Sequence, residues 1–223
     1  PPPPPRHSRR TTHVPGQYLE TLAYAYSAVR PDEPSWGAAQ RSPDRDEWIA
    51  AQHSELDSLH KNGTFEYLPS LPRGRTFVRS HYLCKIKRQV DGSIDKYKVR
   101  LVASGNTQVA GVDFHDVFAP VVRFESLRLF LALVSVFALC TAQFDVSSAF
   151  LHSALDEDLI LRLPDGQFAR LRKSIYGLRQ AARNWYRSIT DFLITFGLVQ
   201  LHSDSCVYVF RSPELDVILI LVL

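Results

Sequence analysis

The sequence contains no methionine and only three cysteines, at positions 84, 140 and 206. Thiols this far apart form neither a disulfide framework nor a zinc-ligand pattern, which favours a reducing intracellular compartment. The absence of methionine, together with an opening run of five prolines, fits an internal piece of a longer product. A separate protein whose initiator is removed before proline is the equal alternative.

Long apolar runs are also lacking. The longest extends from Leu129 to Cys140, interrupted only by Ser135, and is shorter than the roughly 20 residues that cross a bilayer. The amino-terminal residues are rich in proline and arginine and contain no apolar core, which excludes a signal peptide. We therefore expect no membrane partner.

The rest of the composition is that of an ordinary globular protein. Hydrophobic residues make up 45% of the 223 positions and charged residues 22%, with a formal net charge of +3. This length predicts one folded domain, and the mildly basic charge permits nucleic acid as a partner without requiring it. Residues 1–33 are predicted to be a disordered or weakly structured Pro/Arg-rich leader. The folded part is then 34–223.

Hydrophobic periodicity predicts a mixture of helices and strands. Helices are expected at 44–60 and 178–196, and a third at 125–140 that is apolar on nearly every side and therefore buried under a sheet. Strands are expected at 82–90, 93–104, 142–146, 206–210 and 217–223. Their irregular alternation favours the α+β class with an antiparallel or mixed sheet.

The first two predicted strands flank Asp91-Gly92, a pair that favours a tight hairpin turn. On the second strand, cations alternate with Tyr97, Val99 and Leu101, so that one face is basic and the other apolar. The pattern alone leaves two interpretations open: the solvated outer face of a hairpin, or a charged finger that contacts phosphates. The basic residues of the two strands are Lys85, Lys87, Arg88, Lys96, Lys98 and Arg100.

Several segments together resemble the reverse transcriptase of Ty1/copia-type retrotransposons. They are DEWIAAQHSELDSLHKNGTFE (46–66), KIKRQVDGSIDKYKVRLVASGNTQVAGVDF (85–114), FAPVVRFESLRLFLAL (118–133), FDVSSAFLHSALDEDL (144–159) and LRKSIYGLRQAARNWY (171–186). Each is a weak signal alone, but they follow the family's order and spacing. The resemblance implies an RNA-directed DNA polymerase with a right-hand fold. Residues 34–223 would supply the fingers and part of the palm, a mixed or antiparallel sheet packed on helices.

The resemblance also implies magnesium-dependent nucleotidyl transfer. Asp145, in FDVSSAF, matches the family's first catalytic aspartate and would bind Mg²⁺, one of two ions that carboxylates hold. From the residues alone, an aspartate at a strand end is more often a cap, so this role depends on the motif. Phe150 would lie beneath the sugar and exclude a 2′-hydroxyl. Main-chain N–H groups near Val146 would contact the triphosphate.

Two further motifs carry expected contacts. Lys98 and Arg100 match the family's KARLVAKG segment and would bind the dNTP phosphates, with Arg100 favoured because its guanidinium binds phosphate bidentately. Gln180 would contact the template or incoming base. Ala182 departs from the proline that the family usually has, which weakens the turn there. The remaining nucleic-acid contacts are expected from Lys85, Lys87, Arg88, Lys96, Gly177, Arg179 and Arg183. For 170–187, a basic helix on a solvated face remains the alternative.

Two metal-like patterns are set aside. The acidic cluster Asp156–Asp158 is expected to point to solvent in a loop. His202 and Cys206 provide two ligands, which do not make a structural zinc site.

The family's Tyr-Val-Asp-Asp hairpin, which carries the other two catalytic carboxylates, is not found in the sequence. We therefore expect the 223-residue chain to be inactive alone and to be a fragment of a Pol polyprotein with protease, integrase and RNase H. Template-primer and dNTPs would be its partners, in a cytoplasmic virus-like particle or the nucleus. The alternatives are a noncatalytic nucleic-acid-binding remnant or domesticated protein, and a structural domain without a present role.

Overall fold

The computed structural model describes residues 32–210 and 218–221, so most of the predicted leader lies outside the described residues. The helices are α2 (Trp36–Ala39), α3 (Arg45–Lys61), α4 (Phe124–Phe137) and α5 (Ala181–Thr195), with short 3-10 turns η1 (Gly105–Thr107) and η2 (Ala149–His152). The strands are β1 (Phe65–Leu68), β2 (Val78–Arg88), β3 (Ile94–Ala103), β4 (Ile160–Arg162), β5 (Phe168–Leu171), β6 (Val199–Gln200), β7 (Val207–Phe210) and β8 (Ile218–Leu221).

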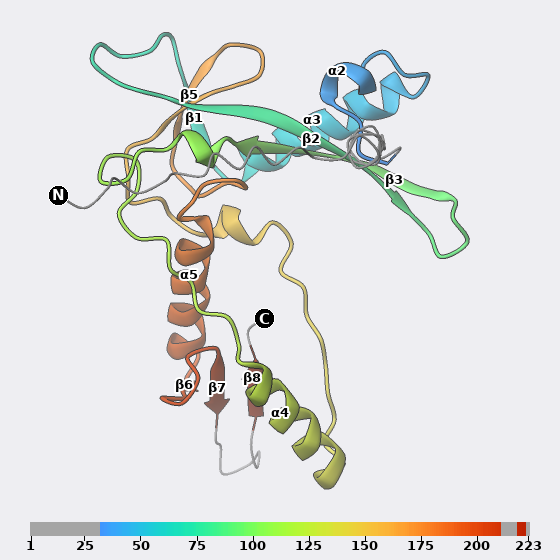
Figure 1. Cartoon of the computed structure of the whole chain (residues 1–223), viewed down its shortest axis with the longest axis vertical. Helices are drawn as coiled ribbons and strands as arrows, with labels where there is room; N and C mark the ends of the chain where they lie inside the picture. The colour runs from blue at the N-terminus through green and yellow to red at the C-terminus, as the bar shows by residue number, and fades with distance from the viewer. Residues whose placement is uncertain (1–31, 211–217, 222–223) are drawn as a thin grey trace, which may run out of the picture.

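The larger sheet has the strand order β1-β5-β4-β2-β3. Its pairs are antiparallel except for β2 and β4, which run parallel through Val78 and Arg79. This mixed sheet with packed helices confirms the α+β prediction. The long β2–β3 hairpin projects away from the rest of the molecule, and α3 lies along it (Figure 1).

The hairpin forms where the sequence predicts it, but its turn is longer than expected. Gln89 N–H donates to Ser93 O at 2.9 Å, and Gly92 N–H donates to Gln89 O at 3.0 Å. The pairing slips by one residue at Arg88, which faces Ile94 instead of Asp95. A three-residue loop therefore replaces the tight two-residue turn, with Gly92 at a φ of +86°.

Alternation along the hairpin places its apolar side chains on one face. Val99 and Leu101 are buried, and Cys84 lies beside them in the core. Trp48 of α3 packs on this face, with its ring centroid 4.7 Å from that of Tyr97. The predicted apolar face is thus the one that α3 covers, because burial of these side chains is the main stabilising term.

A second unit, which contains a smaller sheet, lies at the far end of α5 from the large sheet (Figure 1). Its sheet has the order β6-β7-β8, all antiparallel, and the strands predicted at 206–210 and 217–223 are its β7 and β8. Leu193, Leu198 and Tyr208 form a small core between α5 and this sheet. Gly197, at a φ of +98°, follows the end of α5 as predicted.

Three local predictions were wrong. No strand forms at 142–146, because no described strand pairs with that irregular segment. The helix predicted at 125–140 forms as α4 but is not buried: none of its side chains is, because no sheet among the described residues packs over it. The helix predicted from Leu178 begins only at Ala181, since Gly177 adopts a φ of +89° and holds a turn there.

The segment before residue 44 packs against the hairpin. Its described part contains α2, and Ser35 forms an antiparallel bridge with Leu83 of β2. No helix among the described residues is long and apolar enough to cross a membrane.

Candidate nucleotide and nucleic-acid interface

Three side chains from distant segments meet at one place. The Phe150 ring of η2 lies 5.1 Å from the Tyr176 ring, centroid to centroid, in an edge-to-face arrangement. The Arg100 guanidinium of β3 lies over the same Tyr176 ring, with its Cζ atom 4.4 Å from the ring centroid. The structure therefore joins two residues that the sequence assigned to the dNTP site, Phe150 and Arg100, through an aromatic residue between them.

Tyr176 is a site residue that sequence reasoning missed. It precedes Gly177 in the turn before α5, and its carbonyl accepts a hydrogen bond of 2.8 Å from Ala103 N–H at the end of β3. A tyrosine beside glycine in an otherwise basic segment was the available signal. Tyr176 is only partly buried.

The backbone at this junction is unusually close-packed. A Cβ on Gly177 would lie 2.1 Å from Ala103 O, and a Cβ on Gly105 would lie 2.1 Å from Gly177 O. Only glycine allows this approach. The sequence predicted that Gly177 lets the backbone approach a nascent base pair, whereas in the structure its backbone closely approaches the end of β3.

The hairpin gathers cations on the face opposite α3. Lys85 lies directly across from Lys98, and Lys87 from Lys96, so like charges face one another across the two strands. Burial, and then the neighbouring cations with Arg100 foremost, lower the pKa of Lys98. Facing like charges destabilise a sheet, so this arrangement points to a function for the charges.

Other predicted nucleic-acid contacts already have acidic partners. Arg88 is paired with Asp32 at 2.8 Å, Lys85 with Glu33 at 3.0 Å, and Arg183 with Asp116 at 3.0 Å. The Arg88 bond lowers the pKa of the Asp32 carboxyl, despite slight burial. Within the described part of the chain, no acidic group lies within 4.0 Å of Lys87, Lys96, Lys98 or Arg100.

Gln180 is part of a buried hydrogen-bond network. It is fully buried, its amide N–H donates to Asp113 O at 3.0 Å, and its carbonyl accepts from the Gln108 amide at 3.1 Å. Arg179 joins the same network: its main-chain N–H donates to Gln108 at 2.9 Å and its Nε to Gly105 O at 2.8 Å. Both side chains hold the segment after η1 against the turn before α5.

Asp145 and Val146 lie in the exposed, irregular segment between α4 and η2, visible as a long connection in Figure 1. Among the described residues, no group of three or more His, Cys, Asp or Glu side chains is placed to hold a metal ion. Asp145 by itself therefore does not make a closed magnesium site. The next residues turn sharply, with Ser148 at a φ of +55°.

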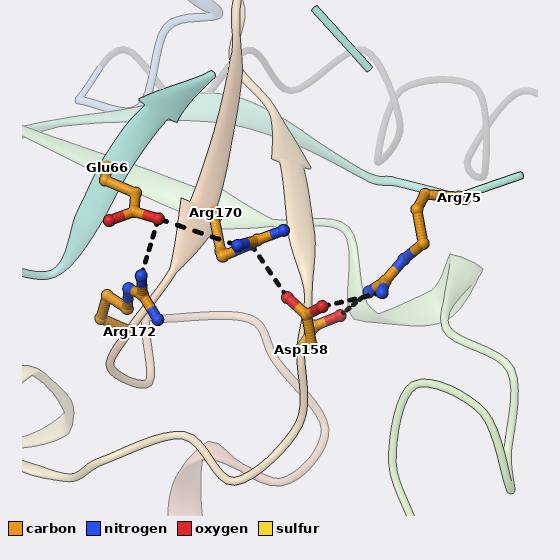
Figure 2. A network of polar contacts seen from close by, with 5 residues as sticks. All are labelled: Glu66, Arg75, Asp158, Arg170 and Arg172. Carbon is orange, nitrogen blue, oxygen red and sulfur yellow. Dashed lines mark hydrogen bonds and ion pairs between the residues drawn. The ribbon is translucent and has the colours of Figure 1, made fainter. Parts of the chain in front are cut away.

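Asp156 and Asp158 of the acidic cluster are exposed, as expected, and both also form ion pairs with arginines. Figure 2 shows Asp158 between Arg75 and Arg170, at 2.7 and 3.1 Å. Arg170 Nε makes this contact as an ion pair without hydrogen-bond alignment. Glu66 continues the network to Arg172 at 2.7 Å. These ion pairs join β1 and β5 to the segments that precede β2 and β4.

Comparisons with known proteins identify the family of the chain. Residues 62–222 match the family model described as reverse transcriptase (RNA-dependent DNA polymerase). The chain is 36% identical over 187 residues to the retrovirus-related Pol polyprotein from transposon TNT 1-94 of Nicotiana tabacum, which covers 80% of this chain and 14% of that protein. The corresponding polyprotein from transposon RE2 of Arabidopsis thaliana is 34% identical over 200 residues, 86% of this chain and 14% of that protein.

A third relative, the Pol polyprotein from transposon RE1 of Arabidopsis thaliana, is 33% identical over 175 residues, 75% of this chain and 12% of its own length. The chain thus spans about a seventh of the relatives it matches. No solved structure matches it. The family model and these identities establish that the chain belongs to the reverse transcriptase family, as a reverse transcriptase domain of the retrotransposon Pol polyprotein type.

Proposed function

We propose that this domain binds the incoming nucleotide at Arg100, Tyr176 and Phe150, and the template-primer along the basic face of the β2–β3 hairpin. The observation that carries the proposal is that the Tyr176 ring contacts both the Arg100 guanidinium and the Phe150 ring. The three residues come from three separate segments of the chain. Residues 34–223 would be the fingers and part of the palm of a right-hand polymerase that copies RNA into DNA.

The chemistry of these side chains suits a nucleotide. A guanidinium forms paired, charge-assisted hydrogen bonds with phosphate oxygens. Aromatic rings give a flat apolar surface for the sugar, and Phe150 would leave no room for a 2′-hydroxyl. Tyr176 holds Arg100 and Phe150 at a fixed separation, because its ring contacts both.

Magnesium remains an expectation of the family. Asp145 would be one ligand, and two-metal transfer would need further carboxylates beside it, which the described residues do not provide. We propose accordingly that residues 1–223, assayed alone, bind nucleotides and template-primer without joining nucleotides to the primer. Magnesium-dependent primer extension that disappears in Asp145→Ala would refute this part.

The nucleotide site is tested with dCTP and CTP, which differ only in the 2′-hydroxyl. Calorimetric titration into the chain with bound RNA template and DNA primer is expected to give tighter binding of dCTP. Phe150→Ala should remove most of that preference. Arg100→Gln should weaken both nucleotides about 10-fold to 100-fold, because a charged hydrogen bond contributes roughly 1.5–3 kcal/mol.

Phe192→Ala and Arg41→Gln are matched controls, since both residues are exposed and neither takes part in the contacts with Tyr176. They should bind both nucleotides as the unmodified chain does. If Arg100→Gln binds dCTP normally, the proposed nucleotide site is wrong. If template-primer binds with a steep salt dependence and no nucleotide binds, the alternative of a noncatalytic nucleic-acid-binding protein is favoured.

A further inference from the structure

The segment Asp32–Ser35, called here the acidic strap, lies along an edge of β2 that the large sheet leaves open. On that side, β2 pairs with β4 only through Val78 and Arg79. Further along, Ile86 N–H donates to Asp32 O at 2.7 Å, and Ser35 forms an antiparallel bridge with Leu83. The strap thus covers main-chain groups that an edge strand would otherwise expose.

The strap also neutralises cations of the hairpin. The Asp32 carboxylate accepts from Arg88 Nε at 3.0 Å and from the Arg88 terminal nitrogen at 2.8 Å, a forked arrangement. Glu33 accepts from Lys85 Nζ at 3.0 Å. Each of these carboxylates competes with a phosphate for its cation and offsets the charge that would attract the phosphate.

The strap is held in place by the core. Ser35 caps α2 by accepting from Ala38 N–H at 3.2 Å, and Ala39 is buried in the cluster that contains Trp48. The Trp36 ring lies 5.0 Å from that of Tyr82. Because both ends of α2 are fixed to the hairpin, the two carboxylates stay beside their cations.

The hairpin cations therefore fall into two sets: Lys85 and Arg88 form ion pairs, whereas Lys87, Lys96, Lys98 and Arg100 form none within 4.0 Å with a described residue, and Glu55 acts on Lys98 and Arg100 only from a longer distance. We propose that the acidic strap withdraws Lys85 and Arg88 from phosphate contact and confines the nucleic-acid backbone to the path of the second set. This inference rests on the proposed binding of template-primer by the hairpin. The carboxylates also repel phosphates that approach the strap edge, which restricts the path further.

The test is the variant Asp32→Asn/Glu33→Gln, which removes both charges and keeps the main-chain bonds of the strap. Binding of a fluorescent RNA–DNA duplex is measured by anisotropy across a series of salt concentrations. The slope of log K against log salt should steepen by about 1–2, because each newly available cation adds a phosphate contact. At low salt, the variant should bind at least about threefold more tightly than the unmodified chain.

Asp57→Asn/Asp191→Asn is the matched control. It changes the net charge by the same amount on exposed faces of α3 and α5, where neither carboxylate has an ion pair with a described residue. It should leave the slope unchanged. Adding Lys85→Gln/Arg88→Gln to the strap variant should abolish its gain, since those cations are the proposed source of the new contacts. Thermal melting checks that each variant remains folded.

The outcomes separate the two proposals. If the unmodified chain binds the duplex, and the strap variant has the slope of the control, the strap inference is wrong and nucleic-acid binding stands. If the strap variant binds less tightly, the carboxylates orient the cations for binding, which also overturns the inference. If neither chain binds the duplex at low salt, both proposals fail.

Discussion

At the residue scale, the sequence singled out Arg100 and Phe150 for the proposed nucleotide site but not the residue that lies between them. Arg100 and Phe150 both contact the Tyr176 ring, and Tyr176 was not predicted as a site residue. Gln180 was expected at a base and is instead fully buried beside Gln108. Its burial depends on a partner 72 residues earlier in the sequence, which no local pattern contains.

The burial of Gln180 makes a prediction about stability. Gln180→Leu removes the Gln180 bonds to Asp113 O and to the Gln108 amide, which leaves these two buried groups only their long mutual bond of 3.5 Å. Unpaired buried polar groups are destabilising, and we expect the free energy of unfolding to fall by about 2–4 kcal/mol. Urea denaturation followed by circular dichroism measures the change.

Gln40→Leu serves as the control for Gln180→Leu, because Gln40 is exposed and its side chain makes no hydrogen bond with a described residue. Its free energy of unfolding should stay near that of the unmodified chain. A Gln180→Leu protein that unfolds normally but loses dCTP binding would return Gln180 to the nucleotide site, as the sequence first suggested.

At the scale of elements, the period and alternation of hydrophobic residues predicted the helices and strands that depend on local sequence. The β2–β3 hairpin, its basic and apolar faces, and α3 all follow from patterns within a few residues. Burial was less predictable. The α4 sequence is apolar on nearly every side, yet the first turn of α4 is held instead by polar bonds: Asp204 accepts from Arg123 N–H at 2.9 Å and from the Ser126 hydroxyl at 2.6 Å. Apolarity indicates a tendency to be covered, but the covering element is set by the tertiary fold.

The basic face of the hairpin predicts a conflict between stability and binding. Lys98→Met removes a cation that faces Lys85 and is half-buried. Facing like charges cost roughly 0.2–1 kcal/mol, so the melting temperature should rise by about 1–4 °C. Duplex binding should weaken, with the salt slope shallower by about 1.

The pH dependence separates this explanation from a simple gain in hydrophobic packing. Because burial and neighbouring cations lower the pKa of Lys98 from 10.5, the unfolded chain holds this proton more tightly than the folded chain. Stability therefore rises as the pH increases through the window from the lowered pKa to 10.5, as the folded chain loses the unfavourable charge. The gain in Lys98→Met should shrink toward pH 10.5, whereas a packing gain would persist. Lys61→Met, at the exposed end of α3, should show no gain.

At the scale of the whole molecule, the separately predicted parts are joined through contacts that no local pattern specifies. The end of β3, η1 and the turn before α5 meet at Ala103, Gly105 and Gly177, with main-chain atoms too close for any side chain. The sequence motif marked Gly177 as a place of close approach to a nascent base pair, but it did not indicate the approach to the end of β3. The ion-pair network in Figure 2 joins distant segments in the same way, since Arg172 and Glu66 are separated by 106 positions.

The junction can be tested by comparing two glycines with nearly equal backbone angles. Gly177 has a φ of +89° and Gly166 one of +92°, but a Cβ at Gly166 would meet nothing within 4 Å. Gly166→Ala should therefore reduce the free energy of unfolding only by the cost of placing an alanine at a positive φ, about 1–2 kcal/mol. Gly177→Ala adds a Cβ that must displace the end of β3, and we expect a loss above about 4 kcal/mol, or no cooperative unfolding at all. Urea denaturation of the two variants side by side measures the difference. Equal losses would mean that the junction can open without cost, and that Arg100 is held over Tyr176 by some other part of the fold.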